Sequence, residues 1–189
     1  MLYLASRSPR RHALLEQIGL DPVLLEVSVT EVRQPGEPAL DYVNRVAREK
    51  AGAGLLAVVG VPGALVLAAD TEVILDDEVL GKPADAAAAA CMLRRLSGRT
   101  HGVCTVVWLV HAGGEASARV QSEVTFSPLS DATLAAYLDS DEWQGKAGAY
   151  AIQGRAAAFI AHLSGSYSGV MGLPLFETAS LLRAQGVFI

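Results

Sequence analysis

The sequence lacks the features that would place the protein outside the cell, in a membrane or on a nucleic acid. Its 189 residues include only two cysteines, Cys91 and Cys104, which form neither a disulfide framework nor a metal-ligand spacing. No apolar run is long enough to span a bilayer, and too few apolar residues precede the first arginines for a signal peptide. The formal net charge is −5, and the basic residues cluster locally instead of covering a face. We therefore expect a reduced, cytoplasmic protein with a small anionic partner and no contact with a membrane or a nucleic-acid polymer.

Several common catalytic motifs are also absent. The chain has no P-loop sequence, no Gly-x-Gly-x-x-Gly after a strand and no Gly-x-Ser-x-Gly nucleophile elbow. Its four histidines have no metal-ligand spacing between them, and no serine has a visible histidine and carboxylate partner. We therefore do not expect covalent serine catalysis.

The residues that are present predict a well-packed α/β protein. About half are hydrophobic and 19% are charged, which allows a substantial core. Helical periodicity alternates with short apolar runs, and Gly113-Gly114 marks a hairpin, so we expect a mixed sheet in a single domain over residues 1–189. The expected strands are 2–5, 23–29, 64–69 continued by 73–75, 79–80, 103–111 and 118–126. The expected helices are 9–18, 38–56, 85–97, 130–138 and 174–185.

The first strand leads into a segment that favours anion binding. Ser8 is a suitable N-cap, and Pro9 fits the first helical position, where its missing N–H costs nothing. Free N–H groups at a helix start attract anions, whereas the helix dipole disfavours cations there. Arg7, Arg10 and Arg11 nevertheless surround this start. A surface helix that happens to begin with arginines is the alternative, but the cluster favours a phosphate site.

Two carboxylates are candidates for metal binding and proton transfer. Asp70 follows the most apolar strand-like run, where a carboxylate is costly unless it binds a cation, a donor or a proton. A turn-capping aspartate is the alternative. Glu31, in a predicted loop, carries little information alone, but with Asp70 it could hold Mg²⁺ or Mn²⁺.

Two lysines could contact the same anion. Lys50 lies on the apolar stripe of its predicted helix, four residues after Val46, either because its stem snorkels or because it points into the phosphate site. Lys82 lies between Gly81 and Pro83 on a stiff turn, and by itself it would be taken as a surface lysine.

Seven segments in series resemble the Maf family of nucleoside triphosphate pyrophosphatases. They are ASRSPRR (5–11), REKA (48–51), AADTEV (68–73), GKP (81–83), LSGRTH (96–101), GKAGAYAIQG (145–154) and GSYSGVMGLPL (165–175). The resemblance implies an elongated mixed sheet with flanking helices and two lobes around a nucleotide-binding cleft, similar to inosine triphosphate pyrophosphatases. It also implies hydrolysis between the α and β phosphates with a divalent metal cation, Mg²⁺ or Mn²⁺, and it is compatible with a homodimer.

The resemblance also implies roles for individual residues. Asp70 matches the proton acceptor and, with Glu31, the metal-binding carboxylates, while Lys50 and Lys82 match catalytic cations. The positions matching the triphosphate cradle are Ser8, Arg10, Arg11, Lys50 and Lys82. The positions associated with base selection are Arg10, Thr71 and Gln153.

The motif around Gln153 is similar to that of the branch acting on dTTP and UTP. A glutamine amide offers one donor and one acceptor, which match O4 and N3–H of uracil or thymine. Two alternatives remain: a 7-methyl-GTP pyrophosphatase, which Gln153 disfavours, and a nucleotide-binding regulator of septum formation without catalysis. The chain departs from the family pattern at Arg7, where glycine is common, at Glu72, where an apolar residue is common, and slightly in the loop 169–171. Arg7 either adds a phosphate contact or is a surface charge.

Overall fold

The computed structural model describes all 189 residues, and its central feature is a seven-stranded mixed sheet. The strand order is β2-β1-β3-β5-β6-β7, and β4 pairs with β3 beside this path. β1 is parallel to β2 and β3, whereas the remaining pairs are antiparallel. The strands are β1 Leu2–Ala5, β2 Val23–Leu25, β3 Leu65–Leu75, β4 Glu78–Leu80, β5 Thr100–His111, β6 Gly114–Phe126 and β7 Ile160–Ser164. The expected α/β class with a mixed sheet is confirmed.

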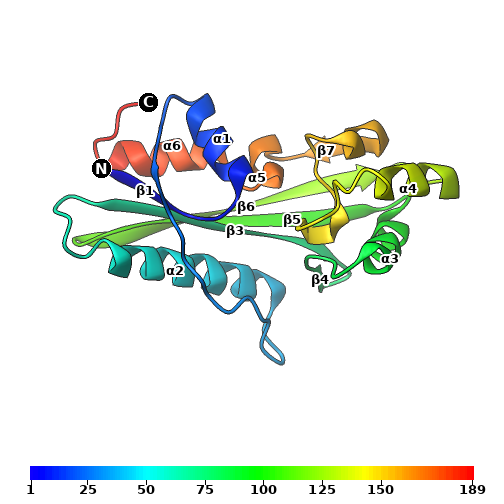
Figure 1. Cartoon of the computed structure of the whole chain (residues 1–189), viewed down its shortest axis with the longest axis horizontal. Coiled ribbons are helices and arrows are strands. Elements are labelled where there is room, and N and C mark those ends of the chain that lie inside the picture. Colours follow the sequence, from blue (N-terminus) through cyan, green and yellow to red (C-terminus); the bar gives the residue numbers. More distant parts are fainter.

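Helices cover both faces of the long strands (Figure 1). They are α1 Pro9–Gln17, α2 Ala39–Ala57, α3 Ala86–Leu96, α4 Asp131–Leu138, α5 Tyr167–Met171 and α6 Leu175–Ala184, with 3₁₀ turns η1 Ala147–Ala149 and η2 Arg155–Phe159. In Figure 1, α2 lies along one face, while α1 and α6 lie on the other near the chain termini, and α3 and α4 lie toward the far end of the sheet. This elongated arrangement with two groups of helices agrees with the two-lobed shape expected. No helix combines the length and the apolar character needed to cross a bilayer.

Alternate residues of β3 pack against different helices, because successive side chains of a strand point to opposite faces. Val66 and Ala68 contact a cluster that includes Ala51 of α2. Leu67 and Ala69 pack with leucines of α1 and α6 on the other face. The far end of β3 contributes to a third cluster, with α3, α4 and the aromatic residues near η1. One strand therefore connects all these cores.

β3 also contains a gap in its pairing that positions the functional groups. β1 pairs with β3 only as far as Leu67, and β4 begins to pair at Val73. Residues 68–72 are therefore paired with β5 on one side and with no strand on the other. Side chains from both faces of β3 can reach the open edge between β1 and β4. We call this stretch of open edge the β3 window.

Several elements differ from those expected from the sequence. The second strand ends at Leu25 instead of residue 29, and the two predicted runs around Asp70 form one continuous strand. Asp70 therefore lies within a strand, and its access to the pocket comes from the β3 window. β7 and α5 were not predicted, because each is only five residues long, and β7 is set by its tertiary pairing with β6.

Candidate active site

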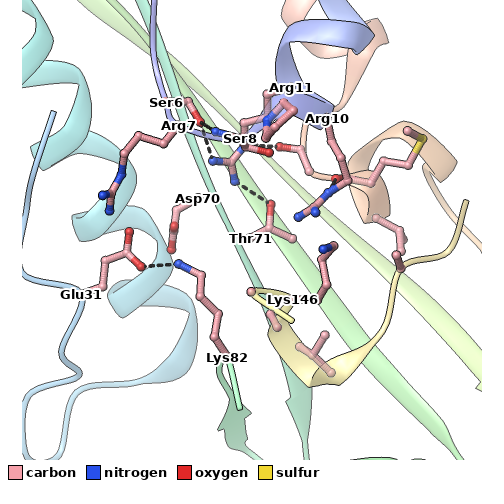
Figure 2. A pocket seen from close by; sticks show the side chains of 18 of the residues that line it. Ser6, Arg7, Ser8, Arg10, Arg11, Glu31, Asp70, Thr71, Lys82 and Lys146 are labelled. Carbon is pink, nitrogen blue, oxygen red and sulfur yellow. Dashed lines mark hydrogen bonds and ion pairs between the residues drawn. The ribbon is translucent and has the colours of Figure 1, made fainter. Parts of the chain in front are cut away.

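One cavity of about 520 Å³ opens at the β3 window and contains every site residue expected from the sequence (Figure 2). These residues are Ser8, Arg10, Arg11, Glu31, Lys50, Asp70, Thr71, Lys82 and Gln153. They come from elements far apart in the sequence: the β1–α1 segment, the loop before α2, α2 itself, β3, the turn after β4 and the segment after η1. The cavity volume lies in the range typical of small-molecule sites.

Asp70, Lys50, Glu31 and Lys82 form a chain of alternating charges. Lys50 Nζ donates to Asp70 Oδ1 at 2.7 Å and lies 2.6 Å from Glu31 Oε1. Lys82 Nζ donates to the other oxygen of Glu31 at 2.6 Å. Lys50 is buried on the apolar side of α2, the face on which the helix spacing predicted it.

The surroundings of Glu31 and Glu72 shift the pKa values of these two carboxyl groups in opposite directions. Burial raises the pKa of Glu31, but the hydrogen bonds from Lys50 and Lys82 outweigh burial and lower it to about 2. Glu72, two residues after Asp70, is buried, and its burial together with the charge of Asp70 raises its pKa to about 8. At neutral pH Glu31 is therefore ionised, whereas Glu72 is mainly neutral.

Asp70 retains one oxygen for further chemistry. Its side chain is buried, and Oδ2 has no hydrogen-bond partner, which is costly for a buried polar atom. No group of three or more His, Cys, Asp or Glu side chains forms an all-protein metal cage in this structure. Asp70 and Glu31 nevertheless fit Mg²⁺ or Mn²⁺, because such ions are often held by one or two carboxylates, with waters and phosphate oxygens as the other ligands.

The guanidinium of Arg11 hydrogen-bonds to protein groups on several walls of the cavity. Its Nε donates to the carbonyl oxygen of Gly172 at 2.7 Å, and its terminal nitrogens donate to Ser6 Oγ and Thr71 Oγ1, each at 3.2 Å. The hydroxyl of Ser8 makes no capping bond, although Ser8 occupies the N-cap position of α1, so that part of the expectation is wrong. Its backbone N–H donates to Ser6 Oγ, and the Ser8 hydroxyl remains available to a ligand.

The opposite end of the cavity combines free polar groups with apolar surface. Arg10 Nε donates to the carbonyl oxygen of Met171 at 3.3 Å, while Gln153 is exposed and has no hydrogen-bond partner. Lys146 also lines the cavity, where burial lowers its pKa and the charge of Arg10 lowers it further. Apolar side chains in the lining include Val73, Val103, Val170 and Met171. This end suits a nucleobase, and the cationic β1–α1 end suits phosphates.

Sequence reasoning missed three residues that help to build the cavity. Ser6 accepts from Arg11, and Lys146 and Tyr150 line the wall. Lys146 and Tyr150 lie in the quoted motif GKAGAYAIQG, so the signal for them was present. Ser6 lies in the quoted motif ASRSPRR, but its contact with Arg11 was not predictable, because that contact depends on the folded position of Arg11.

The sequence comparison agrees with this architecture. The model of the family described as Maf-like protein matches residues 1–185. This chain belongs to the Maf family. It is 57% identical to proteins named dTTP/UTP pyrophosphatase from Xanthomonas euvesicatoria pv. vesicatoria (strain 85-10) and Xanthomonas campestris pv. campestris (strain ATCC 33913), over 98% of this chain and 99% of each relative. It is 55% identical to the nucleoside triphosphate pyrophosphatase of Xylella fastidiosa (strain 9a5c), over 96% of this chain and 97% of the relative. The resemblance to the Maf family is thereby confirmed.

Proposed function

We propose that this protein hydrolyses dTTP and UTP, and modified pyrimidine nucleotides of the same shape, to the monophosphate and pyrophosphate. The relatives named dTTP/UTP pyrophosphatase support the substrate class. The observation that carries the reaction is the unpartnered, buried Oδ2 of Asp70 at the β3 window, in a cavity lined with cations. A free carboxylate oxygen at that place can accept a proton from an attacking water.

In this mechanism the triphosphate lies between the β1–α1 segment and the lysines. A water attacks the α phosphorus and transfers a proton to Asp70 Oδ2, the bond from the α phosphorus to the α–β bridging oxygen breaks, and pyrophosphate leaves with that oxygen. Lys50 and Lys82 neutralise the charge that develops on the phosphates. Removing one such preorganised contact commonly raises a barrier by about 3 kcal/mol.

Glu31 and Asp70 would hold a divalent cation, Mg²⁺ or Mn²⁺, which when bound supplies positive charge to phosphate oxygens and lowers the pKa of water. Lys50 and Lys82 keep Glu31 ionised down to low pH, because their hydrogen bonds stabilise the carboxylate. An ionised carboxylate is the form that ligates a cation.

Base selection in this proposal rests on Gln153, with Arg10 and Thr71 nearby. The free amide of Gln153 would donate to O4 and accept from N3–H of uracil or thymine. Arg10 is fixed by its bond to Met171, and Thr71 by its bond to Arg11, so both are held in defined positions beside the cavity.

The test is pyrophosphate release from UTP, dTTP, CTP, GTP and 7-methyl-GTP, each with MgCl₂, MnCl₂ or EDTA. We expect turnover of UTP and dTTP that EDTA abolishes. Preferential turnover of 7-methyl-GTP would assign the protein to the guanine-specific alternative. Nucleotide binding without turnover of any substrate would support a regulator without catalysis and overturn the proposed reaction. Turnover unaffected by EDTA would remove the metal from the mechanism.

A further inference from the structure

The cations that line the cavity differ in how many donors they have left for a ligand. Arg11 uses all three nitrogens in bonds to the protein, and Lys50 is held between two carboxylates. Lys82 is paired with Glu31, and the Nε of Arg10 is bonded to a backbone carbonyl. Arg7 lines the cavity and forms no hydrogen bond or ion pair at all, as Figure 2 illustrates for the residues drawn.

An unpaired arginine at this position is electrostatically unfavourable without a ligand. Arg7 immediately precedes the N-cap of α1, where the helix dipole is positive, and Arg10 and Arg11 follow within the first turn. The carboxylates of Glu31 and Asp70 are paired with Lys50 and Lys82, and neither forms an ion pair with Arg7. An anion in the cavity would supply the missing partner, and a guanidinium with all five N–H groups free can bind a phosphate through two of them at once.

The position of Arg7 indicates which part of a nucleotide it would contact. In Figure 2 its side chain extends on the Glu31 side of the cavity, whereas Arg10 extends on the Lys146 side. Lys146 belongs to the same wall as Gln153, the end that suits the base. Arg7 therefore lies at the end of the cavity away from the base, where the phosphates farthest from the nucleoside would be.

We propose that Arg7 binds the β and γ phosphates of the substrate and holds the pyrophosphate product after cleavage. This inference rests on the proposed function, which defines pyrophosphate as the leaving group. Arg7 is then a substrate-binding residue in addition to Arg10, Lys50 and Lys82. Its contact favours triphosphates over diphosphates and makes pyrophosphate a stronger product inhibitor than the nucleoside monophosphate.

The experiment compares product inhibition by inorganic pyrophosphate and by UMP in the wild type, in Arg7→Gln and in Arg7→Lys. Hydrogen bonds to a charged group are each worth enough to change affinity by about tenfold or more. We expect Arg7→Gln to raise the inhibition constant for pyrophosphate by at least about tenfold and that for UMP by less than about twofold. Arg7→Lys, which keeps the charge but loses the two-pronged geometry, should fall between the two proteins.

Arg119→Gln is the matched control for charge. Arg119 is exposed on β6, forms no hydrogen bond or ion pair, and lies outside the cavity. This variant should leave both inhibition constants unchanged. Equal effects of Arg7→Gln and Arg119→Gln would reduce the role of Arg7 to long-range charge and overturn the proposal. A pyrophosphate constant within twofold of the wild type in Arg7→Gln, or equal changes for pyrophosphate and UMP, would also overturn it.

Calorimetric binding of pyrophosphate separates this inference from the proposed function. If the wild type releases no pyrophosphate from any nucleotide, the proposed function fails, and the Arg7 contact can still be measured by direct titration with magnesium pyrophosphate. If the wild type is active and Arg7→Gln binds pyrophosphate as tightly as the wild type does, only the inference about Arg7 fails. Because the Arg7 side chain is exposed and unpartnered, thermal unfolding should be the same in all these proteins.

Discussion

Arg11 donates a hydrogen bond of 2.7 Å to the backbone carbonyl of Gly172, across 161 positions of the sequence. This contact joins α1 to the segment after α5, and the other donors of Arg11 extend the connection to β3 and to the end of β1. Arg11 thus organises one side of the cavity. The sequence pattern assigns Arg11 to phosphate binding. The structure shows that Arg11 also positions the walls of the site.

Arg11→Lys should lower both stability and activity. Lysine has one donor group in place of the guanidinium fork, so at least one of the three acceptors would lose its partner. We expect a decrease of about 2 kcal/mol in the free energy of unfolding, measured by urea denaturation. Arg10→Lys, which loses one bond to a backbone carbonyl, should cost about 1 kcal/mol. Equal losses in the two variants would contradict the structural role of Arg11.

Asp70→Asn should abolish turnover while nucleotide binding persists. An amide cannot accept the proton of the attacking water, and general-base catalysis contributes roughly 10²- to 10⁴-fold to a rate. We therefore expect kcat for UTP to fall by about 10²- to 10⁴-fold. Binding of UTP, measured by calorimetry, should remain, because the cations are retained and one negative charge is removed. A variant with wild-type kcat would exclude Asp70 as the proton acceptor.

Gln153→Glu should shift selectivity away from UTP. A carboxylate offers only acceptors, so the O4 oxygen of uracil would face a negative charge where the amide donated a hydrogen bond. We expect kcat/KM for UTP to decrease by roughly 10- to 100-fold, the cost of leaving one polar group unpaired. The ratio of kcat/KM for GTP to that for UTP should rise in the same assay. An unchanged substrate profile would show that the base is recognised elsewhere in the cavity.

The sequence predicted the parts of the site that depend on local pattern. Helical spacing placed Lys50 on the buried face of α2, and the apolar run around Asp70 marked it as a costly carboxylate that needs a partner. The β3 window was not predictable, because it results from where β1 stops and β4 starts along the same strand. The role of Ser6 likewise depends on a buried arginine from the next helix. Both the β3 window and the Ser6–Arg11 contact depend on how segments distant in the sequence are aligned in the fold, which no local sequence pattern encodes.

Gly148 and Gly145 offer a matched pair for testing how the segment with Lys146 docks on β3. Both have φ of +65°, but a Cβ at Gly148 would lie 2.8 Å from Val73 Cγ2, whereas nothing lies within 4 Å at Gly145. Alanine at either position carries the strain of a left-handed backbone, about 1–2 kcal/mol. Gly148→Ala should lose about 1–3 kcal/mol more by urea denaturation, because it also overpacks against Val73. Equal losses would mean that the segment does not pack closely on β3.

His101 and Tyr150 form a buried pair behind the cavity wall. His101 Nε2 and the Tyr150 hydroxyl are 2.8 Å apart, and Nδ1 of His101 has no partner. Burial lowers the pKa of His101 from 6.5 to about 4, so the folded protein keeps the ring neutral where the unfolded chain binds a proton. The contribution of the neutral His101 ring to the free energy of unfolding is therefore fully present above pH 6.5. This contribution is lost progressively as the pH falls toward 4.

His101→Gln removes this titration, although it also lowers stability by a constant amount through the changed packing. The stability advantage of the wild type over His101→Gln should therefore shrink as the pH falls from 7 to about 4.5, in urea denaturation at several pH values. His162→Gln is the control, because it makes the same substitution at a histidine that is exposed on β7 and lies outside the His101–Tyr150 pair. A wild-type advantage over His101→Gln that stays constant or grows on acidification would show that His101 is protonated in the folded state. The His101 ring would then be less buried behind Tyr150 than the structure places it.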